Sequence, residues 1–173
     1  IGSNSFYMPK SLESISIPST LTLIEKNALR FTSSLNAVYI DDIKTWCNIN
    51  FANEQCNPLY YAHNLYLNSE LVTDLIIPST VEHIKDFCFY NCTSIKSISF
   101  EKGVKSVGNY VFSNCSNLSY ISFNDDLTSI GISAFYNCHL LSNFTLPKKL
   151  ETIGAYAFYN CLSLTNIILP EYV

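Results

Sequence analysis

The chain has 173 residues, of which 48% are apolar, and its net charge is −4, so one domain with a sizeable core is expected. Only 14% of the residues are charged and only 10 are Lys or Arg, which argues against nucleic acid or an anionic membrane as partners. No stretch approaches the roughly 18 uninterrupted apolar residues of a spanning helix, so we expect no membrane insertion by this segment. The first residues also lack the basic and apolar regions of a signal peptide, which indicates a removed leader or an excised piece.

An internal repeat of 23 residues runs through the chain. Four copies align without a gap, and in each of them Phe, Asn and Cys recur at fixed places, for example at Phe89, Asn91 and Cys92. The same register continues backwards to the first residues. We therefore expect a single domain, 1–173, divided into a partial repeat 1–17, a repeat 18–40, an extended repeat 41–77, repeats 78–100, 101–123, 124–146 and 147–169, and a cut repeat 170–173.

Each repeat predicts one coil of a solenoid. The pattern L-x-x-I-x-F/L alternates as a strand with one buried face does, and a proline or polar residue follows it and ends the strand. Next comes V/L-x-x-I-G, which predicts a tight turn at Gly108, Gly131 and Gly154, although Lys85 and Glu25 at the same place show that a positive φ is not strictly required. The segment A-F-x-N-C predicts a single helical or 3-10 turn. The expected strands are 12–17, 35–40, 72–77, 95–100, 118–123, 141–146 and 164–169.

Stacking buries the inward residues of neighbouring coils and aligns these strands in a parallel sheet, roughly 30 Å long, on one face. At either end of the stack an edge strand is open, at 12–17 and at 164–169. Because capping repeats would normally cover such edges, we expect the ends to fray or to support end-to-end self-association.

The repeat resembles the BspA-like, or treponemal-type, class of leucine-rich repeat, whose motif reads approximately L-x-x-I-x-L-P-x-x-V-x-x-I-G-x-x-A-F-x-x-C. The segments LSLTNIILP and KKLETIGAYAFYNC match it nearly residue by residue, and the match covers almost all of the chain. The resemblance implies an α/β-type repeat solenoid, a right-handed leucine-rich-repeat superhelix. It also implies an extracellular or cell-surface protein, mostly bacterial, that is used in adhesion and host contact. It transfers no catalytic residue.

The regular spacing is interrupted in the extended repeat, where 37 residues stand in place of 23. Residues 63–72 resemble two strands around a tight turn at Asn68, so we expect a hairpin that projects from the solenoid. One interpretation is a structural elaboration typical of the class. The other is a ligand-contacting role for the insertion residues Trp46, Tyr60, Tyr61, His63 and Tyr66.

The seven cysteines do not predict a disulfide framework, because the count is odd and four of them follow the repeat. Cys92, Cys115, Cys138 and Cys161 share one inward place and are expected to be free, buried thiols. Cys47 and Cys56 are the only pair that we would test as a disulfide. The scattered histidines predict no metal site, and we expect no cofactor.

No motif predicts catalysis. Cys47, His63 and Asn64 are the residue types of a nucleophilic site, but nothing around them would activate a nucleophile, and the chain is expected not to be an enzyme. The repeated asparagines fall in two glycosylation sequons, at Asn91 and Asn114. Hydrogen bonding to turn backbone groups of a neighbouring coil is the more plausible role for them.

The candidate binding surface is the open face of the sheet. Strand alternation places on it a set of hydroxyl, amide and tyrosine side chains, which suit contacts with a protein or glycan macromolecule. The alternative is that they are solvated strand residues that are merely tolerated. The preferred function is a non-enzymatic recognition module for adhesion or protein–protein interaction, and the alternative is a stalk or spacer that presents another domain. The candidate residues are Tyr39, Ser97, Ser99, Tyr120, Ser122, Asn143, Thr145 and Asn166.

Overall fold

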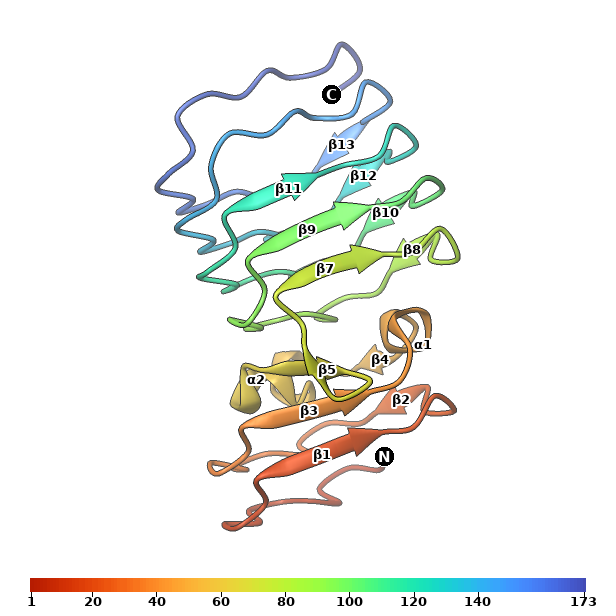
Figure 1. Cartoon of the computed structure of the whole chain (residues 1–173), viewed down its shortest axis with the longest axis vertical. Helices are drawn as coiled ribbons and strands as arrows, with labels where there is room; N and C mark the ends of the chain where they lie inside the picture. The colour runs from red at the N-terminus through yellow and green to blue at the C-terminus, as the bar shows by residue number, and fades with distance from the viewer.

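The computed structural model describes residues 1–173 and shows a stack of coils, with the two chain ends at opposite ends of the long axis (Figure 1). Successive coils lie in register, so that a residue usually faces its counterpart 23 positions along the chain, as in the pairs Ser97 with Tyr120 and Ser106 with Ser129. A single core of 43 buried apolar residues fills the interior of the stack from Ile17 to Cys161. The predicted repeat solenoid is confirmed.

The first side of the stack, which we call the sheet face, is formed by parallel strands that fall into two sheets. Along each strand the odd and even residues alternate between the core and the surface, as in the exposed–buried pattern of residues 74–77. Five of the seven expected strands form. They are β1 (Ser14–Ile17) and β3 (Ala37–Ile40) in one sheet, and β7 (Asp74–Ile77), β9 (Ser97–Phe100) and β11 (Tyr120–Ser122) in the other. The first sheet also contains β5 (Leu65–Leu67) and β6 (Glu70–Leu71), which pairs antiparallel with β5.

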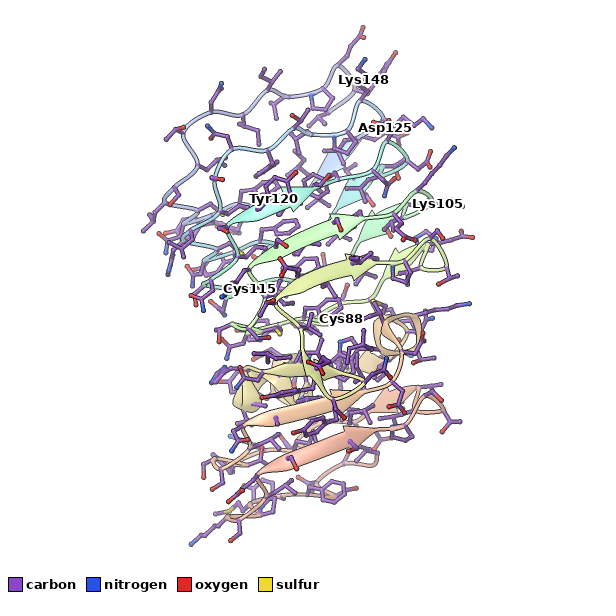
Figure 2. The ribbon with its side chains drawn as sticks, viewed as in Figure 1. Cys88, Lys105, Cys115, Tyr120, Asp125 and Lys148 are labelled. Carbon is purple, nitrogen blue, oxygen red and sulfur yellow. The ribbon has the colours of Figure 1, made fainter.

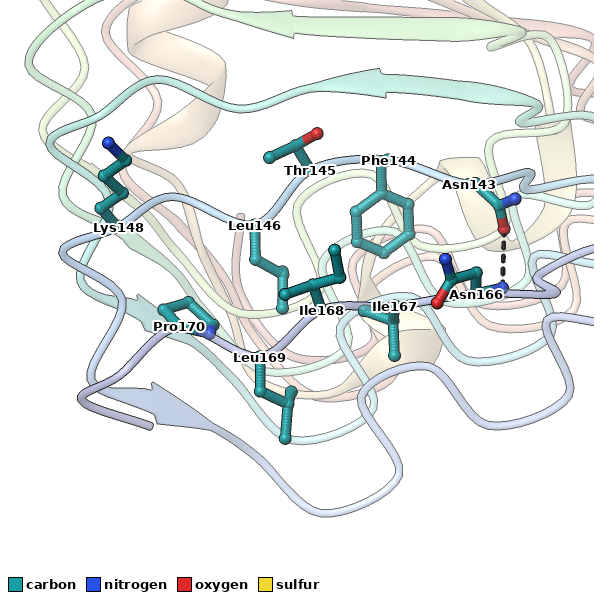
Figure 3. Close-up of a pocket in the computed structure, with 10 residues that line it drawn as sticks. All are labelled: Asn143, Phe144, Thr145, Leu146, Lys148, Asn166, Ile167, Ile168, Leu169 and Pro170. Carbon is teal, nitrogen blue, oxygen red and sulfur yellow. Dashed lines mark hydrogen bonds between the residues drawn. The ribbon is translucent and has the colours of Figure 1, made fainter.

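The expected strands 141–146 and 164–169 do not form. Only one backbone hydrogen bond, from Ser142 N–H to the Ser119 carbonyl, joins residues 141–146 to the preceding strand segment, and the Ser142 hydroxyl donates to the same carbonyl. In the last coil the Asn143 side-chain oxygen accepts the N–H groups of Thr165 and Asn166, each at 3.0 Å (Figure 3). A side chain thus takes the donors that a backbone carbonyl would accept in a sheet, and these segments run extended without a strand ladder.

The second side carries short parallel strands that the sequence analysis did not predict. Each is two residues long and ends just before the glycine place of the repeat, where the analysis expected only a tight turn. They form a two-stranded and a four-stranded sheet. The strands are β2 (Leu23–Ile24) and β4 (Asn50–Phe51) in the first, and β8 (His83–Ile84), β10 (Ser106–Val107), β12 (Ser129–Ile130) and β13 (Thr152–Ile153) in the second.

The glycines after these strands are explained by close approach between coils and not by a turn that needs a positive φ. None of Gly108, Gly131 and Gly154 has a left-handed φ. A Cβ added to Gly131 would lie 2.5 Å from the carbonyl carbon of Gly108, and one added to Gly154 would lie 2.5 Å from that of Gly131. The backbones of successive coils therefore meet where no side chain fits. The predicted turn does begin here, since the N–H groups of Ala134 and Ala157 donate to the carbonyls of Gly131 and Gly154 at 3.4 and 3.2 Å, but the turn is not what requires glycine.

The third side, which we call the turn face, is built from consecutive turns. The expected helical or 3-10 turn does not form in the regular repeats, because each coil has two residues with positive φ, such as Phe87 and Asn91, and these interrupt a helix. The N–H groups of Phe87, Phe89 and Asn91 instead donate to carbonyls of the next coil. Helices occur only in the extended repeat, as α1 (Ile43–Cys47), the 3-10 helix η1 (Glu54–Cys56) and α2 (Leu59–Ala62).

The predicted hairpin is present, but it does not project as expected. Asn68 and Ser69 both have positive φ, as a two-residue hairpin turn requires, and β5 and β6 pair antiparallel across it. However, β5 also pairs in parallel with β3, so that Leu67 faces Ile40 and the first hairpin strand is part of the sheet. The hairpin separates the two sheets of the sheet face, since β7 pairs with β9 and not with β6.

Residues of the extended repeat join the two halves of the stack. The amide of Asn57, which is fully buried, donates to the carbonyls of Phe87 and Cys88 at 2.7 and 2.9 Å. The indole N–H of Trp46 also donates to the Cys88 carbonyl, at 3.0 Å. In the regular repeats the counterpart of the Cys88 carbonyl accepts a backbone N–H of the preceding coil, as the Val111 carbonyl does from Phe89. Side chains of the extended repeat take that role for Cys88, and one continuous core runs across the joint.

Identical side chains stack from coil to coil in the C-terminal half. The rings of Phe89, Phe112, Phe135 and Phe158 are parallel within 15°, with centroids 5.2–5.3 Å apart. The Asn137 amide donates to the side-chain oxygen of Asn114, and Asn160 does the same to Asn137, each at 2.8 Å. Asn91 instead donates to the Tyr60 backbone carbonyl. The expected bonding to backbone is therefore right for Asn91 and wrong for Asn114, whose amide donates to the Tyr90 hydroxyl at 2.9 Å.

The four repeat cysteines are free and buried, as predicted, and so are Cys47, Cys56 and Cys88. The thiols of Cys115, Cys138 and Cys161 donate to the carbonyl of a phenylalanine in the preceding coil, at 3.2–3.3 Å. Burial raises the pKa of the Cys92 and Cys161 thiols to about 11, and it raises those of Cys115 and Cys138 well above the ordinary value. Cysteine serves here as a small apolar residue with a weak donor.

Substitution of Gly131 by Ala is expected to destabilise the chain by about 1–3 kcal/mol, because the two coils would have to separate to admit the methyl group. Gly2 occupies the same place in the first coil, and a Cβ there meets nothing closer than 3.6 Å. Gly2→Ala is therefore the matched control, with an expected change below about 0.5 kcal/mol. Urea unfolding of the two variants checks this, and equal midpoints would contradict the close-approach explanation.

The repeat thiols are expected to react slowly with a thiol reagent in the native chain and completely after unfolding without reductant, with Cys161, the least buried, reacting first. Because the folded pKa values are raised, the thiols contribute stability that is fully present below their ordinary pKa near 9 and is lost as pH rises toward about 11. Native labelling between pH 7 and 9 should therefore stay slow. Fewer than four reactive thiols from these positions after unfolding would rule this out.

Candidate functional site

The sheet-face candidates lie where alternation predicted, on the outer surface of the strands. Tyr120 is the most prominent, with 57% of its surface exposed at the start of β11 (Figure 2). Ser122, Asn143, Thr145 and Asn166 are also exposed, whereas Tyr39, Ser97 and Ser99 are half-buried. The face is thus an open, mainly uncharged surface of hydroxyls and amides with a few large rings.

Two candidates that the sequence analysis had placed in separate groups come together. Tyr39 of β3 pairs in register with Tyr66 of β5, and their rings stack with centroids 4.8 Å apart and an interplanar angle of 29°. This contact exists because the insertion contributes a strand to the sheet. The sequence could not show it while the hairpin was expected to project away from the solenoid.

Besides the exposed Glu70 of β6, one carboxylate interrupts the neutral surface, at Asp74 at the start of β7. It accepts hydrogen bonds from the hydroxyls of Ser97 and Thr73. These bonds, Ser97 first, lower the pKa of Asp74, so it is ionised at neutral pH. Ser97 is therefore engaged with a strand neighbour and has less capacity left for a ligand than its neighbour Ser99.

The C-terminal part of the sheet face is hollowed. A cavity of about 390 Å³ lies between residues 143–148 and 166–170, and its walls include Phe144, Leu146 and Ile168 (Figure 3). Of the candidates, Asn143, Thr145 and Asn166 line it. Asn143 is also the residue that bonds to Thr165 and Asn166, so its amide positions the backbone of the last coil.

The insertion candidates do not form one site. Trp46 is only 1% exposed and its indole donates to a backbone carbonyl, so it is a core residue and the proposed ligand contact is wrong. Tyr66 lies on the sheet face. Tyr60, Tyr61 and His63 lie on or next to the turn face, where Tyr60 stacks on Tyr90 and a ring nitrogen of His63 is 3.3 Å from the Asn91 carbonyl.

The sequence analysis missed a group of tyrosines on the turn face. A cavity of about 440 Å³ lies there, and Tyr110, Tyr156 and Tyr159 around it are 36–65% exposed. The repeat itself carries the signal, because a tyrosine recurs between Phe and Asn in three copies of F-x-N-C. The full lining is Tyr90, Tyr110, Ser113, Asn114, Ser133, Tyr136, Tyr156 and Tyr159.

Charged side chains gather elsewhere, at the loops between the first and second sides. Lys105 pairs with Glu82 at 2.7 Å and Lys149 with Asp126 at 3.0 Å, both between neighbouring coils. Figure 2 shows Lys105, Asp125 and Lys148 along this edge. The hydrogen bonds from the lysines lower the pKa values of Glu82 and Asp126. Because the pairs are exposed, they contribute little stability. Their place at these loops also means that the sheet face and the cavity lined by tyrosines are almost free of charge.

The remaining chemistry is limited. The buried repeat thiols have raised pKa values and so lack the thiolate that a nucleophile needs. Cys47 is fully buried, and the Nδ1 atom of His63 lies 3.3 Å from the Asn91 carbonyl oxygen. No three His, Cys, Asp or Glu side chains gather so that they could hold a metal ion. None of the helices has the length and apolar character needed to cross a membrane.

Comparison with solved structures agrees with this geometry, although no curated protein sequence matches the chain. Among solved structures, a leucine rich cell surface protein from Faecalibacterium prausnitzii A2-165 is similar, with a TM-score of 0.61 and 27% identity over 96% of this chain and 41% of that one. A leucine-rich repeat protein from Bacteroides ovatus ATCC 8483 has a TM-score of 0.50 and 24% identity over 99% of this chain and 52% of that one, and shows the fold alone.

The chain therefore spans about half the length of these two proteins or less. The sequence model of a protein family, described as the BspA type leucine rich repeat region, matches residues 1–60 and 60–173 in six copies. The repeat pattern, the stacked coils and this match agree over the whole length. The chain belongs to the BspA-type leucine-rich repeat family.

Proposed function

We propose that the chain is a non-enzymatic recognition module of a cell-surface or secreted bacterial protein, which binds a macromolecule, most simply a protein, through its sheet face. The observation that carries the proposal is the stacked pair Tyr39 and Tyr66 on the same open surface as the exposed Tyr120. Tyrosine offers a large contact area for little loss of conformational entropy. The surrounding serine, threonine and asparagine side chains add short hydrogen-bonding groups.

The family and its structural relatives support this proposal. The Faecalibacterium prausnitzii relative is described as a leucine rich cell surface protein, which supports an extracellular or surface location for this chain. Repeat solenoids bind partners over extended surfaces, because stacking presents the same row of side chains along many coils. Adhesion is the form of recognition that fits a surface protein of this kind.

A spacer is the alternative function, and one observation favours it. The chain spans only 41% of the length of the Faecalibacterium prausnitzii protein, so other parts of such a protein could be what the coils present. The continuous core across the joint, held by Trp46 and Asn57, would suit a stiff stalk. A spacer needs no conserved binding chemistry on the sheet face, which separates the two functions by experiment.

The double substitution Tyr39→Ala and Tyr120→Ala is expected to weaken binding at least tenfold, because it removes the two rings that the sheet face offers on either side of the joint. Binding of the labelled chain to immobilised extracellular-matrix proteins and to mucin measures the effect. The melting temperature should change little, since neither ring is part of the buried core.

The matched control is Tyr7→Ala with Tyr172→Ala, which removes two exposed tyrosines that lie outside the sheet strands and outside the tyrosine-lined cavity, and should leave this binding unchanged. No saturable binding to any of these surfaces by the unsubstituted chain would favour the spacer. Equal binding by the sheet-face variant and the unsubstituted chain would move the site off the sheet face.

A further inference from the structure

The turn face contains a gap in two otherwise aromatic rows. One row follows residues 90, 113, 136 and 159 and reads Tyr, Ser, Tyr, Tyr; the other follows 87, 110, 133 and 156 and reads Phe, Tyr, Ser, Tyr. The gaps at Ser113 and Ser133 fall in neighbouring coils. Together they remove two rings from adjacent places, and the cavity of about 440 Å³ lies there.

We propose that this cavity, which we call the tyrosine cavity, is a binding site for a neutral oligosaccharide, separate from the sheet face. Its volume falls within the range of roughly 300–1,000 Å³ that is usual for ligand sites. Its walls are phenol rings and its floor carries hydroxyls and an amide. A pyranose has the matching chemistry, with a face of C–H groups and a rim of hydroxyls.

The rings beside the gap present free faces to it. Tyr90 stacks on Tyr60 on its N-terminal side with centroids 5.9 Å apart, and Tyr136 stacks on Tyr159 on its C-terminal side with centroids 5.0 Å apart. The opposite face of each ring is therefore directed toward Ser113. These two walls are two coils apart, which corresponds to roughly 10 Å at the usual strand spacing. That separation admits one sugar ring between them.

The floor supplies hydrogen-bonding groups that the protein leaves free. Ser113 and Ser133 are only 2% and 5% exposed, and their hydroxyls have no hydrogen-bond partner within the chain. Since no fully buried polar side-chain atom lacks a partner, both hydroxyls must open onto the cavity. Nearby, the Asn114 amide donates to the Tyr90 hydroxyl at 2.9 Å, which leaves the Tyr90 proton available to a ligand.

The absence of charge selects a neutral ligand. None of the eight lining residues is charged. Burial first, and then the carboxylate of Glu54, raise the pKa of Tyr90, so the charge that acts on this wall of the cavity is negative and disfavours an anionic glycan. A proline-rich peptide could also lie on tyrosine rings, and its carbonyls could accept from the two serine hydroxyls, but its prolines have no N–H to donate. A sugar hydroxyl can both donate and accept, and so matches the serine hydroxyls in both roles.

The test uses the 173-residue chain with cellotetraose, maltotetraose and mannotetraose, and with a sulfated tetrasaccharide and a proline decapeptide as the competing chemistries. Titration calorimetry gives the affinity, and the side-chain amide signals of Asn114 and Asn137 in NMR spectra report the place of binding. At least one neutral tetrasaccharide should bind more tightly than the sulfated one and the peptide, and should shift these two signals.

Ser113→Tyr with Ser133→Tyr should fill the cavity and lower the affinity at least tenfold. The fold should tolerate it, because tyrosine already occupies these places in other coils. The matched control, Ser99→Tyr with Ser122→Tyr, adds the same two rings to the sheet face and should leave sugar binding unchanged. Tyr136→Ala removes one ring wall of the cavity and introduces no bulky side chain, and it should also lower the affinity at least tenfold.

Absence of saturable shifts with all three neutral sugars up to about 10 mM would overturn the proposal. So would undiminished sugar binding in the filled-cavity variant or in Tyr136→Ala, or a preference for the sulfated sugar or the peptide. The outcome is independent of the sheet face, since Tyr39→Ala with Tyr120→Ala should leave sugar binding intact. Failure here and failure of the proposed function are therefore distinguishable.

Discussion

The structure depends on one distance, the spacing between hydrogen-bonded neighbouring strands, about 4.8 Å, which every coil must keep from the next. Any residue that recurs at 23-residue intervals then meets its own counterpart at that spacing. A flat ring suits it, and the phenylalanine rings stack at 5.2–5.3 Å. A Cβ does not suit it where backbones are in contact, so glycine recurs at Gly108, Gly131 and Gly154.

The same spacing explains the polar and sulfur chemistry of the interior. An asparagine with positive φ can both turn the chain and donate to the asparagine of the preceding coil, as Asn137 does to Asn114. A buried thiol is small enough for the core and still reaches a phenylalanine carbonyl of the preceding coil. Both ion pairs lie at the loops between the first and second sides. The sheet face and the tyrosine cavity are therefore formed mainly by neutral side chains.

Much of this architecture could be predicted from the sequence, because periodicity reports which residues share a place. The coil, the β7 and β9 strands, the burial of Cys92 and its counterparts, and the outward direction of Tyr120 all follow from spacing alone. Backbone dihedrals do not follow from it. The left-handed φ of Phe87 and Tyr110 is rare for aromatic residues, and this is why helical turns were expected where the structure has none.

The extended repeat was the least predictable segment, because it has no second copy with which to compare it. Its hairpin could be found from Asn68, but nothing local showed that β5 would pair with β3 or that Trp46 would support the joint. In the candidate sites, strand alternation predicted the sheet face. The tyrosine cavity was missed because it arises from two residues that break the repeat, Ser113 and Ser133, and a search for what recurs passes over them.

That last feature also bears on how such a chain can change over generations. Each coil meets its neighbour through the same places, so unequal exchange between repeats can add or remove 23 residues without creating a misfit at the new boundary. The core is indifferent to such an event. The gap on the turn face is not, because Ser113 and Ser133 belong to different coils and form one hollow only while those coils adjoin. Duplicating or reordering whole repeats could therefore create or abolish a recognition surface with no point mutation and at almost no cost to the fold.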